Sequence, residues 1–159
     1  MKRVCTLSLI WILVFGFNVS TIGQNLTIPQ KLKIEKQVDS IFNVMVKAAE
    51  KVDYNKISMG VDDRYSAGFL VNNVYYPTYE SLINMLKSNM RSGAKQSITI
   101  QNKKITVLTD NIVLLTASGE SKVESSTGQS LTIEFLWSFV YEKINNNWKV
   151  IQSHQSLAN

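Results

Sequence analysis

Four long β-rich runs in the second half of the chain constrain its fold most strongly. The runs cover Gln96–Leu108, Ile112–Glu124, Ser130–Lys143 and Trp148–Ser156. The turns between them, such as Thr109–Asn111 and Asn145–Asn147, are short and polar. Turns this short join antiparallel neighbours, because parallel strands need a crossover of about a dozen residues or more. The sequence therefore predicts an antiparallel meander.

Helical patterns precede these strands. Between Lys31 and Val52, apolar residues recur at the three- and four-residue spacing of a helix that packs one face on a core. A small hairpin is predicted over residues 66–76, because the asparagines of its central Asn72-Asn73 pair tolerate positive φ. A second helix follows, with Thr78 as its N-cap and Gly93 as its stop. Helices first and strands afterwards predict an α+β domain.

The strand from Ser130 to Lys143 has one strongly aromatic face. Its alternating positions are Ile133, Phe135, Trp137, Phe139 and Tyr141. Ligand pockets are mostly apolar with a few polar groups, so this face suits both a core and a pocket wall. Trp137 and Tyr141 are favoured over Phe135 as pocket residues.

The N-terminus has the layout of a secretory signal peptide over residues 1–23. Lys2 and Arg3 precede an apolar run that is shorter than the ~20 residues of a membrane-spanning helix. A retained membrane anchor is the alternative. We expect cleavage before Gln24, a flexible mature N-terminus over residues 24–30 and one domain over residues 31–159. The protein would then be secreted or periplasmic, without membrane association after cleavage.

Composition argues against several classes of function. Cys5 is the only cysteine and lies in the predicted leader, so no disulfide or cysteine nucleophile is expected in the mature chain. The basic residues are scattered, so no nucleic-acid partner is expected. A single histidine without clustered carboxylates predicts no metal site, and no cofactor motif is present.

The C-terminal pattern resembles the SnoaL-like branch of the nuclear transport factor 2-like superfamily. A strand through Phe139–Lys143 leads by a turn into Trp148…His154-Gln155-Ser156, which is similar to that branch's W-x-(I/V)-x-x-x-H-x-S ending. Residues 68–73 resemble the hairpin of the family. The chain is similar to exported bacterial members over residues 31–156. The resemblance implies a cystatin-type cone, in which a strongly curved antiparallel sheet wraps around the N-terminal helices, with a pocket at its open end and frequent homodimerisation.

Three residues are candidates for catalysis. His154 is the single histidine, and its pKa range suits acid–base chemistry. On a regular strand it would share a face with Trp148 and Gln152. Asp62 or Asp63 could serve as a general base. The alternatives are a structural role for His154 and a charged surface loop for the aspartates.

The predicted ligand-binding residues are aromatic or polar: Tyr54, Tyr65, Phe69, Trp137, Tyr141, Gln152 and His154. The favoured hypothesis is an exported domain that binds an apolar or aromatic small molecule. One alternative is an isomerase, cyclase or hydratase that uses His154 with Asp62 or Asp63. Another is a homodimerising interaction domain. Because the aromatic strand face carries no carboxylate, binding is favoured over catalysis.

Overall fold

The computed structural model describes residues 26–89, 95–125 and 128–158. The predicted signal peptide lies outside these residues, as does the predicted helix stop at Gly93. None of the helices in the described ranges combines the length and the apolarity needed to cross a membrane.

Helix α1 (Ile28–Glu50) begins before the predicted start at Lys31. The reason is a capping box, in which the Thr27 side chain accepts from the Gln30 amide and the Gln30 side chain accepts from the Thr27 amide. Pro29 stands in the first turn, where its missing N–H costs nothing. Residues 28–30 are therefore helical and do not belong to a loose N-terminus.

The strands form one six-stranded sheet in the order β2-β1-β6-β5-β4-β3. Its members are β1 (Phe69–Val71), β2 (Val74–Tyr76), β3 (Lys95–Val107), β4 (Ile112–Glu124), β5 (Ser130–Ile144) and β6 (Asn147–Ala158). The predicted meander from β3 to β6 and the predicted hairpin of β1 and β2 are confirmed. The sheet is nevertheless mixed, because β1 pairs with β6 in parallel. The β1–β2 hairpin reaches the β6 edge from the helical half of the chain and not through a tight turn, so one parallel pair stands beside the predicted antiparallel strands.

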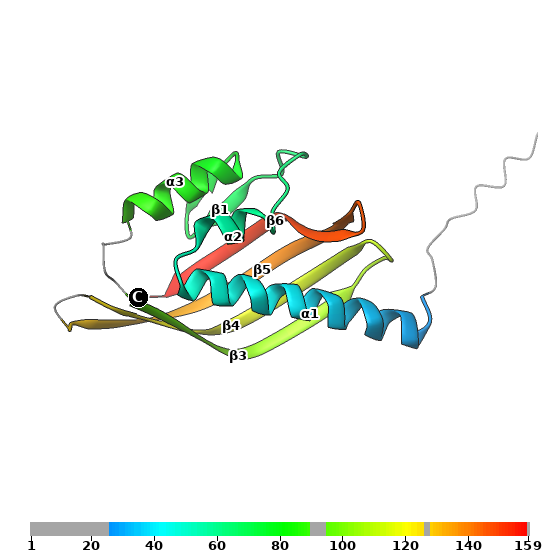
Figure 1. The fold of residues 1–159 in the computed structure, drawn as a ribbon, viewed down its shortest axis with the longest axis horizontal. Helices are drawn as coiled ribbons and strands as arrows, with labels where there is room; N and C mark the ends of the chain where they lie inside the picture. Colours follow the sequence, from blue (N-terminus) through cyan, green and yellow to red (C-terminus); the bar gives the residue numbers. More distant parts are fainter. Residues whose placement is uncertain (1–25, 90–94, 126–127, 159) are drawn as a thin grey trace, which may run out of the picture.

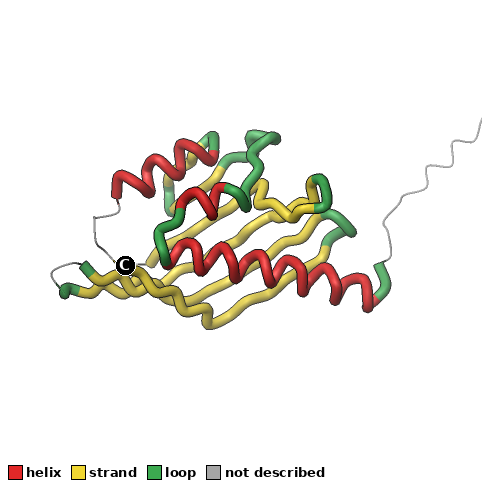
Figure 2. Tube along the Cα trace, viewed as in Figure 1, coloured by secondary structure: helices red, strands yellow, loops and turns green. Residues whose placement is uncertain are grey.

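The three helices of the described chain lie on the concave face and at one end of the curved sheet (Figures 1 and 2). Helix α1 crosses the concave face of the curved sheet, and α2 (Tyr54–Ser58) and α3 (Tyr79–Asn89) lie at one end (Figures 1 and 2). The predicted α+β cone is confirmed. Its core joins α1, α3 and the inner sheet face: Ile34, Val38, Phe42, Phe69, Leu82, Val113, Leu115, Ala117, Phe139, Tyr141, Trp148 and Val150.

A β-bulge in β6 decides which residues of the last strand face inward. Tyr141 pairs with Val150, whereas the preceding Val140 pairs with Gln152, so Ile151 is the extra residue. Because side chains alternate along a strand, one extra residue exchanges the two faces. Val150 and Ser153 are therefore both buried, and His154 is exposed.

Candidate ligand pocket in the cone

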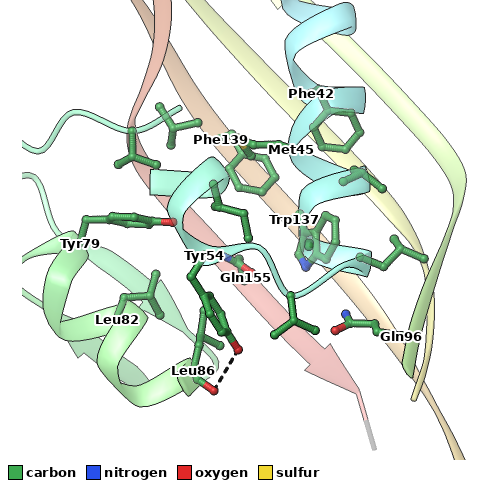
Figure 3. A pocket seen from close by; sticks show the side chains of 17 residues that line it. Phe42, Met45, Tyr54, Tyr79, Leu82, Leu86, Gln96, Trp137, Phe139 and Gln155 are labelled. Carbon is green, nitrogen blue, oxygen red and sulfur yellow. Dashed lines mark hydrogen bonds between the residues drawn. The ribbon is translucent and has the colours of Figure 1, made fainter. Parts of the chain in front are cut away.

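A cavity of about 270 Å³ occupies the end of the cone at which α2 and α3 lie. Its walls come from the second half of α1, from α2 and α3, and from the inner faces of β3, β5 and β6 (Figure 3). Most lining side chains are apolar, among them Met45, Leu82 and Phe139. The walls thus combine helices and strands that are far apart in the sequence.

Five of the lining residues bring polar side-chain groups to this apolar space: Tyr54, Tyr79, Gln96, Trp137 and Gln155. Two of these have partners already. Tyr54 donates from Oη to the Leu86 carbonyl at 3.2 Å, which ties α2 to α3, and Gln96 donates from Nε2 to Ser121 Oγ at 3.1 Å. The remaining groups are free to meet a ligand.

Trp137 is held in place by its neighbours on β5. Its ring stacks on Phe135 with centroids 3.8 Å apart and an interplanar angle of 14°, and it meets Phe139 edge-on at 6.0 Å. These contacts fix the indole plane against the cavity. The indole Nε1 is buried and has no hydrogen-bond partner among the described residues.

Tyr79 faces the cavity from the first turn of α3. Its ring packs edge-on against Phe69 at 5.3 Å, and its backbone amide donates to Asp63 Oδ2 at 3.0 Å. The hydroxyl oxygen is buried and has no hydrogen-bond partner within the described chain. Burial raises the pKa of the Tyr79 phenol well above its ordinary value, and burial also raises that of Tyr54. Both phenols are therefore neutral donors at physiological pH.

His154 does not line this cavity. After the bulge it lies on the outer face of the sheet, where it pairs with Ser138 of β5. It lines a shallow groove there together with Thr116 and Ser156. The expectation that it shares a face with Trp148 is wrong, because that expectation assumed a regular strand. The same bulge carries Gln152 to the outer face, opposite Val140.

The two aspartates have structural partners. Arg64 Nη2 donates to Asp62 Oδ2 at 2.7 Å and forms an ion pair with it. This guanidinium lowers the pKa of the Asp62 carboxyl. Asp63 caps α3 through the Tyr79 amide. The Asp62 amide donates to the Val150 carbonyl. The partners of Val150 and His154 on β5, Tyr141 and Ser138, are three residues apart, so His154 lies about 10 Å further along the strand. The predicted pair of His154 with an aspartate is not formed.

The remaining predicted binding residues divide between the pocket, the core and the surface. Tyr54 and Trp137 line the cavity. Phe69 and Tyr141 are fully buried in the core. Tyr65 is exposed and donates to Glu142 Oε1 at 3.0 Å. Aromatic character alone therefore did not separate pocket from core.

Several pocket residues were missed: Phe42, Met45, Tyr79, Leu82, Leu86, Gln96 and Gln155. One signal was present in the sequence. Tyr79, Leu82 and Leu86 follow the spacing of one helix face, and that face points into the cone. Within the described ranges, no group of three or more metal-ligating side chains comes together.

A model of the calcium/calmodulin dependent protein kinase II association domain matches residues 35–159. The chain belongs to this family. The match begins within α1 and includes every residue that lines the cavity, so the pocket is part of the association domain itself. A search of curated proteins gave no match.

Solved structures agree on the fold. A putative association domain from Xanthomonas campestris is 18% identical, with a TM-score of 0.64 over 76% of this chain and 85% of that one. The association domain of C. elegans CaMKII is 13% identical, with a TM-score of 0.64 over 82% and 99%. A nuclear transport factor 2-like superfamily protein from Salmonella enterica is 14% identical, with a TM-score of 0.69 over 79% and 92%. The predicted superfamily is confirmed, and at these identities the likeness shows the fold alone.

Proposed function

We propose that this association-domain protein binds a small, largely apolar molecule in its cone. The observation that carries the proposal is a cavity of about 270 Å³ with apolar walls and with two buried donors, Tyr79 Oη and Trp137 Nε1, that no described residue satisfies. Binding sites for small molecules are concave and mostly apolar, with few polar groups that orient the ligand. Because the lining residues include no aspartate, glutamate, lysine, arginine or histidine, the proposal is binding and not acid–base catalysis.

A cavity-filling variant tests this proposal. Ala49 lines the cavity from α1, so Ala49→Phe is expected to fill part of the space and to abolish binding while the protein stays folded. Lys47→Phe is the matched control, because Lys47 is exposed on the same helix. Native mass spectrometry of both variants and of the parent protein would measure retained small molecules. Equal ligand loading of parent and Ala49→Phe would contradict the proposal.

A second candidate function is self-association through the outer face of the sheet. Leu136 is 66% exposed there. Leu114 and Val140, which pair with each other further along β4 and β5, are half-buried on the same face. Exposed apolar side chains on the outer face of a sheet suit an interface between two copies. A structural relative, the C. elegans CaMKII domain, is named an association domain, and this name supports self-association.

The oligomeric state can be tested with a single charge. Leu136→Glu is expected to convert a dimer into a monomer in light scattering after size-exclusion chromatography. Met59→Glu is the control, because Met59 is 73% exposed but lies in the turn after α2 and not on β4 or β5. A parent protein that stays monomeric at all concentrations would contradict this second function.

We also propose that the protein is exported, on the strength of the basic and apolar pattern of residues 1–23. N-terminal sequencing of the protein secreted by an expressing cell is expected to begin at Gln24. A cellular product that begins at Met1 would contradict export.

A further inference from the structure

Two hydrogen-bond donors meet the cavity from different walls. Tyr79 points its hydroxyl into the space from α3, and Trp137 contributes its indole N–H from β5 (Figure 3). Ser58 lies near Tyr79 and lowers the pKa of its phenol against the larger effect of burial, but the Ser58 hydroxyl donates to the Tyr54 carbonyl at 2.8 Å. The Tyr79 hydroxyl is thus left without a hydrogen-bond partner among the described residues. Buried polar groups in native proteins almost always have partners. A ligand that carries acceptor atoms would satisfy both donors.

The charge of the lining restricts those acceptors further. The residues around the cavity include no lysine, arginine or histidine, so a buried anion would find no counter-charge. They include no carboxylate, and the raised pKa of Tyr79 keeps its phenol protonated. A cation would therefore face the positive ends of two donors. A neutral ligand avoids both costs.

The size and shape of the space favour rings. The cavity is about 270 Å³, and an engineered protein cavity of about 150 Å³ is sufficient for benzene. The fixed indole of Trp137 and the ring of Phe139 present aromatic surfaces on one wall. Flat molecules pack well against such surfaces.

We propose that the ligand is a neutral compound of one or two rings that carries acceptor oxygens, such as a carbonyl or an ether, for Tyr79 Oη and Trp137 Nε1. This inference rests on the proposed binding function and names the class of ligand. The two donors orient the ligand, and the apolar walls supply most of the affinity.

Three probes with the same naphthalene skeleton test the class of ligand. 2-Acetylnaphthalene carries a neutral acceptor, 2-ethylnaphthalene carries none, and 2-naphthoate carries an anion. Calorimetric titration into the purified protein at neutral pH is expected to rank the ketone first and the hydrocarbon about 3- to 10-fold weaker, the loss of a neutral hydrogen bond. The anion is expected to bind weakest.

Two conservative variants locate the donors. Tyr79→Phe and Trp137→Phe each remove one donor and keep an aromatic ring. At least one is expected to weaken binding of the ketone about 3- to 10-fold and to leave binding of the hydrocarbon unchanged. Tyr75→Phe is the control, because Tyr75 lies on β2 and is 56% exposed. Thermal unfolding of each variant establishes that the protein is folded.

The outcomes separate the two proposals. If neither the ketone nor the hydrocarbon binds, both the proposed binding function and the ligand class fail. If the hydrocarbon binds as tightly as the ketone, or the anion binds most tightly, the binding function stands and the ligand class is overturned. Unchanged affinity of the ketone in both donor variants also overturns it.

Discussion

The inner and outer faces of the same sheet differ sharply in chemistry. On β4 the inward Val113 and Leu115 are fully buried, whereas the outward Thr116 is exposed. On β5 the inward Phe139 is 5% exposed, and the outward Leu136 is 66% exposed. Neighbouring residues thus belong to different environments. The difference shows that the side to which a strand residue points decides whether it can serve the cavity.

The largest loss of stability is expected from a substitution on the inner face of the sheet. Phe139→Ala removes a ring that packs on Phe42 at 6.0 Å and lines the cavity, so we expect it to lower the free energy of unfolding by about 3–5 kcal/mol. Leu136→Ala on the outer face is expected to change it by about 0.5 kcal/mol or less. Urea unfolding of both variants measures the contrast. Similar losses for the two would show that the faces are not energetically distinct.

A single methyl group on the inner face should also disturb the sheet. A Cβ at Gly119 would lie 2.0 Å from the Thr99 carbonyl oxygen and 2.8 Å from the Phe135 ring. Gly119→Ala is therefore expected to destabilise the protein by about 1–3 kcal/mol, because the rigid backbone of β3 must move.

Gly128→Ala is the matched control for this substitution. Gly128 has nothing within 4 Å of an added Cβ, although its φ of +80° adds some strain. Urea unfolding is expected to show the smaller loss for Gly128→Ala. A larger loss there would mean that backbone strain, and not crowding at the inner face, dominates.

The inner face should make the protein sensitive to alkaline pH. Burial raises the pKa of Tyr141 above its ordinary value of 10.0. As pH rises, the unfolded chain releases this proton first, so stability is full below about pH 10 and then falls by up to about 1.4 kcal/mol per pH unit. Tyr141→Phe is expected to reduce this slope when unfolding is measured from pH 8 to 11. An unchanged slope would contradict the burial argument, and the exposed Tyr75→Phe serves as control.

Much of the fold was predictable because its signals are local and repeated. Alternating residues identified the strands, and short polar turns identified their antiparallel order. The aromatic face of β5 was assigned correctly because that strand keeps its alternation from Phe135 to Tyr141. Thr78 was predicted as a cap, and its Oγ1 indeed accepts from the Ser81 amide at 3.2 Å.

The site was less predictable because it depends on contacts between distant segments. The bulge at Ile151 has no glycine or proline to mark it in the sequence, yet it exchanges the faces of His154 and Gln155. The role of Asp63 depends on its bond to the Tyr79 amide, 16 residues later. Only the folded chain brings these residues together.

The smallest expected effect concerns His154, one of the three residues that the sequence offered as candidates for catalysis. Because it is exposed on the outer face and does not line the cavity, His154→Ala is expected to change the free energy of unfolding by about 0.5 kcal/mol or less and to leave ligand loading unchanged. Gln155→Ala is the neighbouring comparison, since Gln155 lines the cavity. Native mass spectrometry and urea unfolding of the two variants measure the difference between adjacent residues. If His154→Ala loses the ligand and Gln155→Ala keeps it, the ligand binds at the outer face of the sheet and not in the cavity.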